Sequence, residues 1–98
     1  MGASKTHQYS AREIHTAKIA NALGHPARIR IMNILKTQPF TRNVDLVDEL
    51  ELVQSTVHKH LRKLYAAGLI EIEFYPNCYY IRSSNAVSES LVEHYDLI

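Results

Sequence analysis

The sequence contains very little cysteine, since Cys78 is the only one among 98 residues. A single cysteine excludes an intrachain disulfide and any metal site built from several cysteines of one chain. It also suits a reducing compartment. No apolar run approaches the roughly 18 residues of a membrane-spanning helix, and residues 1–10 lack the apolar segment of a signal peptide. We therefore expect a cytoplasmic protein.

Glycine and proline are also scarce, with three of each, so few positions interrupt regular structure. Hydrophobic residues make up 46% of the chain and charged residues 21%, which is the composition of a globular protein. The length allows one domain with a modest core. No Gly-rich phosphate loop, Ser/His/Asp arrangement or paired-carboxylate cleft is visible, and we expect the protein not to be an enzyme.

Hydrophobic periodicity predicts four helices, a β-hairpin and a final helix after a flexible arm at residues 1–10. Pro26 suits the first position of a helix, and Gly24 and Gly68 suit helix C-termini. The expected helices are 11–23, 26–36, 44–50, 54–67 and 86–96; the expected strands are 69–74 and 78–82, and 41–43 is expected to be a loop. The order α-α-α-α-β-β-α predicts a mostly helical, α+β winged helix-turn-helix domain over residues 11–98.

The first strand of the predicted hairpin alternates strictly. Ile70, Ile72 and Phe74 fall on one face, while glutamates occupy the positions between them. This pattern is typical of a half-buried strand with one side facing the core. Proline and asparagine at residues 75–77 indicate the turn.

The net charge of +1 conceals an uneven distribution of charge. Residues 1–42 hold seven Lys and Arg against one acid, and residues 43–52 hold four acids and neither Lys nor Arg. Residues 53–67 hold three Lys and Arg and no acid, while 68–98 hold one Arg against five acids. A polyanionic partner would therefore meet particular segments of the chain.

The fourth predicted helix has the pattern of a DNA-reading helix. At about 100° per residue, Val57, Leu61 and Leu64 form a buried stripe, and the opposite side carries hydroxyls and cations without a carboxylate. Long cations reach phosphates or guanine edges, and glutamine pairs with adenine. We predict double-stranded DNA as a partner. The predicted contact residues are Gln54, Ser55, Thr56, His58, Lys59, Arg62, Lys63, Arg28, Arg42 and Asn77.

Apolar residues in the two terminal helices predict a homodimer. Ile14 lies in the first helix, and Val87, Leu91 and Tyr95 recur at helical spacing in the last. A chain of this length does not easily cover both helices by itself, and exposed apolar patches mark interfaces. A two-fold dimer would present two reading helices about 34 Å apart, one turn of DNA.

Several segments resemble the ArsR (arsenic-repressor-like) family of bacterial regulators. Residues 23–31, LGHPARIRI, are similar to the opening signature of that family, and residues 54–64, QSTVHKHLRKL, with AGLI at 67–70, are similar to its recognition helix and entry to the wing. Tyr79 and Tyr80 resemble its second wing strand. The resemblance spans about residues 19–82. It implies a winged-helix dimer, packed through the first and last helices, and a repressor that a signal releases from DNA.

The sensing sites of that family are mostly missing from this sequence. Arg42 and Val44 stand where metal-sensing members carry a cysteine pair, and residues 83–88 contain neither the Asp nor the His of a second family site. His94 is the main remaining candidate ligand late in the last helix, and a structural zinc site normally needs four. We therefore predict no metal and no cofactor. The wing tip also lacks the arginine usual in the family.

Two alternatives to the DNA-binding repressor remain open. The acidic hairpin and the small net charge would also fit a winged-helix module that binds protein and not DNA. A repressor that senses metal through His94, or oxidation through Cys78, is the other alternative.

Overall fold

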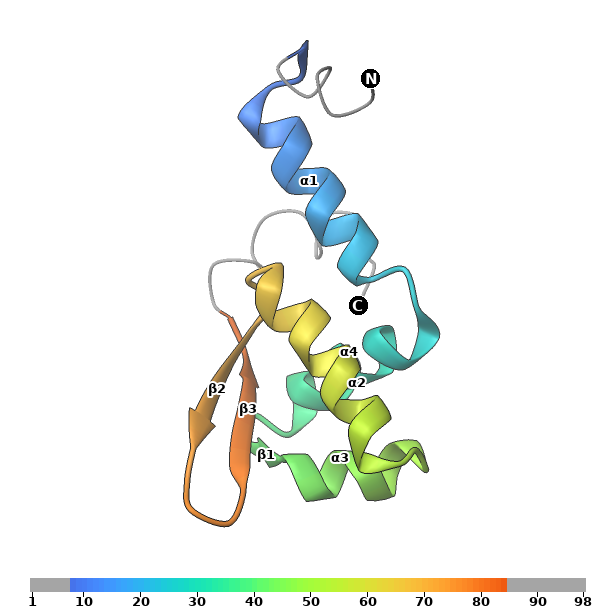
Figure 1. Ribbon diagram of the computed structural model, residues 1–98, viewed down its shortest axis with the longest axis vertical. Coiled ribbons are helices and arrows are strands. Elements are labelled where there is room, and N and C mark those ends of the chain that lie inside the picture. The colour runs from blue at the N-terminus through green and yellow to red at the C-terminus, as the bar shows by residue number, and fades with distance from the viewer. Residues whose placement is uncertain (1–7, 85–98) are drawn as a thin grey trace.

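The computed structural model describes residues 8–84 and contains the first four predicted helices and the hairpin in the predicted order (Figure 1). The final helix predicted at 86–96, with Val87, Leu91 and Tyr95, lies outside the described residues, as does most of the N-terminal arm. No helix within 8–84 is long and apolar enough to cross a membrane. The elements are α1 (Ala11–Ala22), α2 (Pro26–Thr37), β1 (Thr41–Arg42), α3 (Asn43–Leu50), α4 (Gln54–Ala66), β2 (Ile70–Phe74) and β3 (Tyr79–Ser83).

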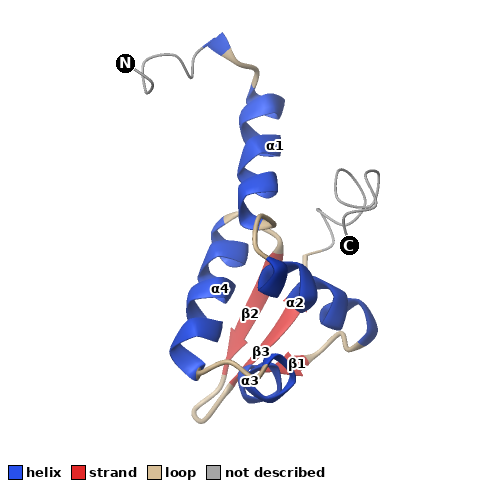
Figure 2. Ribbon diagram, turned by 90° about the vertical axis from the view of Figure 1, so that its right-hand side faces the viewer, coloured by secondary structure: helices blue, strands red, loops and turns tan. Residues whose placement is uncertain are grey.

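Helix α1 projects from a body formed by the other elements (Figures 1 and 2). It starts with a capping box, in which the Ser10 hydroxyl accepts from the Glu13 N–H at 3.0 Å and the Glu13 carboxylate accepts from the Ser10 N–H at 2.8 Å. At its other end, Gly24 does not adopt the left-handed conformation that a helix-stopping glycine often has. A Cβ at Gly24 would instead lie 3.1 Å from the Asn21 carbonyl oxygen, so glycine is favoured by this close approach.

The core lies between the helices of the body and one face of the sheet. The predicted stripe on α4 is confirmed, because Val57, Leu61 and Leu64 are all buried. Buried residues of the other elements complete this core: Ile19, Ala22, Leu23, Ile31, Met32, Leu35, Leu46, Leu69, Ile70 and Ile81. Burial of this apolar surface fixes the orientation of α4, and hence which of its side chains face outward.

The sheet has three strands in the order β1-β3-β2, all antiparallel. The predicted loop at 41–43 was wrong, because Thr41 pairs with Ile81 and Arg42 with Tyr80. Thr41 is only 1% exposed, and its hydroxyl donates to the Gln38 carbonyl at 2.7 Å. A strand of two residues is too short to show the alternation by which strands are predicted.

The turn between α3 and α4 is tight and contains no glycine. Glu51 takes the left-handed conformation, with φ 55°, directly after α3. Val53 then caps α4 in extended conformation. This short connection holds α3 across the N-terminal end of α4, the arrangement of a helix-turn-helix.

Candidate nucleic-acid interface

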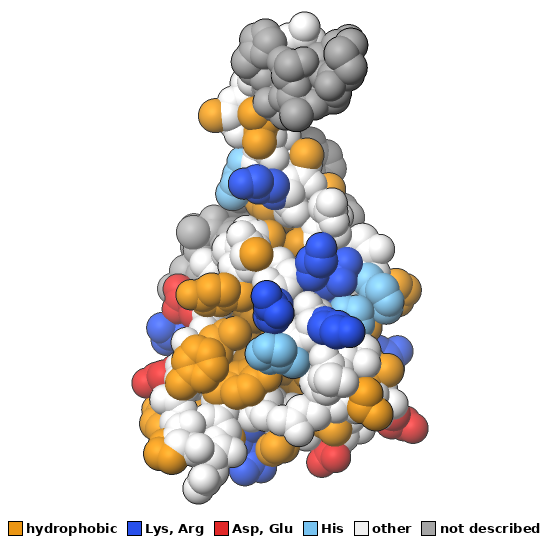
Figure 3. Space-filling model, viewed as in Figure 1, with side chains coloured by type: hydrophobic (Ala, Val, Ile, Leu, Met, Phe, Trp, Pro, Cys, Tyr) orange, Lys and Arg blue, Asp and Glu red, His pale blue; other side chains and the backbone are white. Residues whose placement is uncertain are grey.

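The outer face of α4 carries a row of exposed cations. Lys59, Arg62 and Lys63 are all exposed, as the predicted orientation of the helix requires. In the space-filling view, Lys and Arg side chains gather over α4 beside a hydrophobic patch (Figure 3). Three of the predicted contact residues therefore lie together on one surface, where they are free to bind an anionic partner.

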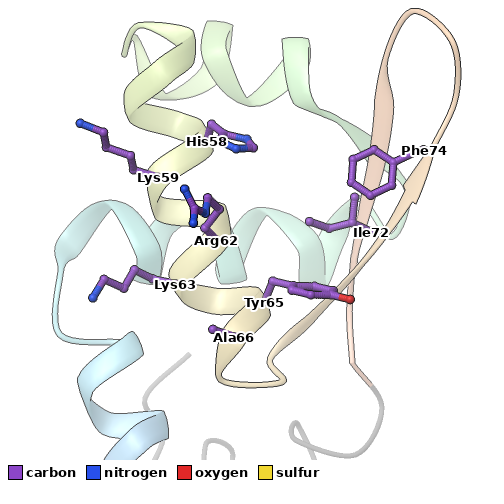
Figure 4. Close-up of a pocket in the computed structure, with 8 residues that line it drawn as sticks. All are labelled: His58, Lys59, Arg62, Lys63, Tyr65, Ala66, Ile72 and Phe74. Atoms are coloured by element: carbon purple, nitrogen blue, oxygen red, sulfur yellow. The ribbon is translucent and has the colours of Figure 1, made fainter.

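An open groove of about 710 Å³ runs between this row and β2 (Figure 4). On the α4 side the groove is lined by His58, the three cations, Tyr65 and Ala66, and on the β2 side by Ile72 and Phe74. Phe74 is 73% exposed and Tyr65 is 58% exposed, while Ile72 is half-buried. No carboxylate lines the described part of the groove, so an anion placed there meets no like charge.

The exposure of Phe74 corrects the interpretation of β2 as a strand with one half-buried face. Ile70 is buried, Ile72 is partly buried, and Phe74 at the far end is exposed. Its strand partner Tyr79 packs against the core, whereas the Phe74 side chain lines the open groove beside α4. Neither Phe74 nor Tyr65 was predicted as a site residue. The position of Phe74, an aromatic residue at the end of a predicted strand, could have indicated it as a contact residue.

The N-terminal end of α4 presents polar side chains. Gln54 and Ser55 are exposed and Thr56 is half-buried, with no acidic residue in the first turn. No side chain caps this end of the helix. The positive end of the helix dipole is therefore open to an anion beside three side chains able to form hydrogen bonds.

His58 of α4 contacts Tyr79 in β3, which together with β2 forms the wing hairpin. Its Nδ1 lies 3.4 Å from the Tyr79 hydroxyl, and the two rings meet edge to face. Burial raises the pKa of Tyr79 above its ordinary value, so this hydroxyl keeps its proton at neutral pH. His58 thereby connects the exposed face of α4 to β3.

Two of the predicted DNA-contacting arginines have partners within the protein. Arg28 donates from Nε to the Ala22 carbonyl and contacts His60 with Nη1. Arg42 forms an ion pair with Asp45, Nη2 to Oδ1 at 3.1 Å. This pairing raises the pKa of Arg42, and the Arg42 hydrogen bond lowers that of Asp45. A phosphate would have to compete with these contacts.

The remaining predicted residues lie on other parts of the molecule. Asn77 is exposed in the turn between β2 and β3, and Ile14 is exposed on α1. The nearby Tyr75 hydroxyl donates to Glu73 at 3.1 Å, which raises the pKa of Tyr75. Cys78 is half-buried beside the wing tip. Within residues 8–84, no group of three His, Cys, Asp or Glu side chains is placed to hold a metal ion.

Comparison with known proteins agrees with this architecture. Residues 25–71 match the family described as bacterial regulatory protein, arsR family. An uncharacterized HTH-type transcriptional regulator from Methanocaldococcus jannaschii is 44% identical over 59 residues, which are 59% of this chain and 60% of the relative. The chain thus matches less than two thirds of the length of that curated relative.

Solved structures share the fold at lower sequence identity. HlyU from Vibrio cholerae superposes with a TM-score of 0.77 at 20% identity, over 89% of this chain and 94% of that chain. The homodimeric winged helix-turn-helix DNA-binding domain Mb0332 from Mycobacterium bovis gives 0.73 at 19% identity, over 91% and 85%. NolR from Sinorhizobium fredii gives 0.64 at 27% identity, over 89% and 94%. The chain therefore has a winged helix-turn-helix fold, and its residues 25–71 are similar to the ArsR family of bacterial regulatory proteins.

Proposed function

We propose that this protein is a sequence-specific regulator of transcription that binds double-stranded DNA, and that it acts as a cytoplasmic repressor. The observation that carries the proposal is the carboxylate-free groove beside Lys59, Arg62 and Lys63. In this reading α4 enters the major groove of DNA, and the cations bind phosphates on either side.

Within this interface we assign different roles to the two ends of α4. The cations supply affinity for any DNA sequence, because phosphates are the same at every base pair. Gln54, Ser55, Thr56 and His58 supply discrimination, because they lie at or near the end of the helix that approaches base edges. Asn77 and Arg42 are assigned auxiliary phosphate contacts, Arg42 only after exchanging its internal partner, and the predicted contact residue Arg28 keeps its internal partners and supports α4 from within.

The proposed assembly is a homodimer formed through α1 and the C-terminal segment. The exposed Ile14 on the projecting α1 supports this, since Ile19 and Ala22 are the only buried residues of this helix and a partner would cover its exposed part. Val87, Leu91 and Tyr95 are the proposed contributions of the last segment. Two copies of α4 would then read two half-sites of one operator.

A winged-helix module that binds protein is the second candidate function. The exposure of Tyr65 and Phe74 beside the cationic row favours it, because aromatic residues with arginine are typical of protein interfaces. Neither candidate involves a chemical reaction, and we propose none.

Selection of bound duplexes from a random DNA pool tests the proposal. We expect enrichment of a two-fold symmetric sequence, and affinity for the selected duplex that falls steeply as salt is raised. Parallel selections with Zn²⁺ and with an oxidant would reveal a sensing role of His94 or Cys78. A pool that shows no enrichment, with binding independent of salt, would favour the protein-binding module.

A further inference from the structure

One arginine connects the end of the projecting helix to the proposed reading helix. Arg28, in the first turn of α2, donates from Nε to the Ala22 carbonyl oxygen at 2.5 Å. Its Nη1 lies 3.1 Å from Nδ1 of His60 in α4. Because a guanidinium only donates, the imidazole must offer a lone pair at Nδ1. The proton of a neutral His60 is therefore on Nε2.

A second imidazole completes the cluster. His25 caps α2, and its Nδ1 accepts the Ala27 N–H at 3.0 Å. The rings of His25 and His60 lie 4.5 Å apart between centroids, tilted by 51°. His60 is only 8% exposed. Both hydrogen bonds need an unprotonated Nδ1, and the His60 ring contacts the permanent positive charge of Arg28.

We propose that Arg28 and His60 are positioning residues for DNA binding, and that protonation of His60, within the cluster that it forms with His25 and Arg28, releases α4 from the end of α1. A proton on Nδ1 of His60 would set two donors against each other and add a like charge beside the guanidinium. Lys59 and Lys63 lie on the same helix within one turn of His60, so movement of α4 there displaces the cationic row. This inference rests on the proposed function.

The surroundings of His60 determine whether acid favours or opposes the release of α4. Burial lowers the pKa of His60 below the ordinary value of 6.5, and the charges of His25 and then Arg28 lower it further. The charged neighbours of His60 on its own helix, Lys59, Arg62 and Lys63, are all cations. No carboxylate in the described part of the chain opposes the effects that lower its pKa. The released form therefore binds the proton more tightly than the closed form, and acid favours release.

The test is the pH dependence of binding to the duplex selected above, from about pH 7.5 to about pH 5.5, where imidazoles titrate. His60→Asn keeps an acceptor near the position of Nδ1 and cannot be protonated. We expect wild type to lose roughly fivefold more affinity than His60→Asn over this interval, the lower end of usual coupling strengths. The ratio of the two affinities at each pH removes any pH effect that does not involve His60.

His15→Asn is the matched control, because His15 is exposed on α1 and outside the cluster. Its pH profile of DNA binding should equal that of the wild type.

NMR titration of the wild-type protein provides a readout that needs neither DNA nor a variant. The amides of Ala22, Ala27 and α4 should shift together as the His60 ring titrates. Equal pH profiles for wild type and His60→Asn, or amides that ignore the His60 titration, would overturn the inference. Absence of DNA binding at pH 7.5 would instead contradict the proposed function. The NMR titration would then decide by itself whether protonation of His60 changes the contacts of α4 with the end of α1.

Discussion

The side-chain oxygen of Asn43, at the start of α3, accepts a hydrogen bond from the backbone N–H of Tyr79 in β3 at 3.1 Å. Asn43 is only 4% exposed, so the bond is shielded from water. Tyr79 in turn contacts His58 of α4 through its hydroxyl. One residue of the wing is thus bonded to both helices of the helix-turn-helix, which fixes the wing relative to the proposed reading surface.

Removing this link should destabilise the fold. In Asn43→Ala the Tyr79 N–H loses its partner, and leaving such a group unsatisfied costs about 1–3 kcal/mol. Urea unfolding followed by circular dichroism measures the loss as a lower midpoint at unchanged slope. Asn33→Ala is the control, since Asn33 is exposed on α2 and the substitution should change the unfolding free energy by less than about 0.5 kcal/mol. Equal effects would show that the bond contributes nothing.

Lys63→Ala should weaken binding to all DNA sequences alike. Each phosphate contact releases about one counterion, so the slope of log affinity against log salt should decrease by ~1 per monomer. Fluorescence anisotropy over a salt series on selected and random duplexes measures it. Lys36→Ala, at the exposed end of α2 and away from the groove, should leave the slope at the wild-type value. A change confined to the selected duplex would contradict the phosphate role.

Gln54→Ala should instead reduce discrimination. Loss of a bidentate contact to a base costs ~1–3 kcal/mol on the selected duplex and little on random DNA. The same anisotropy assay on both duplexes gives the specificity ratio directly. If both affinities fell equally, Gln54 would be a general contact and not a reader.

Much of the fold could be predicted from the sequence because its helices are long enough to show their period. The stripe of Val57, Leu61 and Leu64 alone fixes which side of α4 faces outward. Strand β1 could not be predicted, since two residues show no alternation and pairing of Thr41 with Ile81 depends on a distant segment. The role of Gly24 was likewise set by a close approach within the fold.

The candidate site was predictable where exposure follows from helix geometry, and less so where partners come from other elements. Lys59 and Arg62 lie on the expected face. Sequence spacing gives no sign that Arg28 meets the Ala22 carbonyl and His60, 32 residues away. The same holds for Phe74, whose exposure depends on the open groove that β2 forms with α4.

Ile14→Lys should weaken the proposed homodimer. The side chain is exposed on α1, and a charge placed in an apolar interface must be desolvated without a partner. Light scattering over a dilution series should show monomer at concentrations where wild type is dimeric. His15→Lys changes the neighbouring exposed position, about 100° around the helix, and should affect dimerisation less. A wild-type protein that is monomeric at micromolar concentration would refute the dimer itself.

Phe74→Ala separates the two candidate functions. Because Phe74 is 73% exposed, its removal should change the unfolding free energy by only about 0.5 kcal/mol or less. If DNA occupies the protein groove between α4 and β2, the variant loses apolar contact with sugars or thymine methyl groups. Its binding free energy for the selected duplex should then weaken by roughly 1 kcal/mol. Phe40→Ala is the matched control, since Phe40 is also an exposed aromatic but lines a different hollow with Tyr80. Equal DNA affinity of wild type, Phe74→Ala and Phe40→Ala would show that DNA does not contact the apolar side of the groove. That result would favour a protein partner for the exposed Phe74.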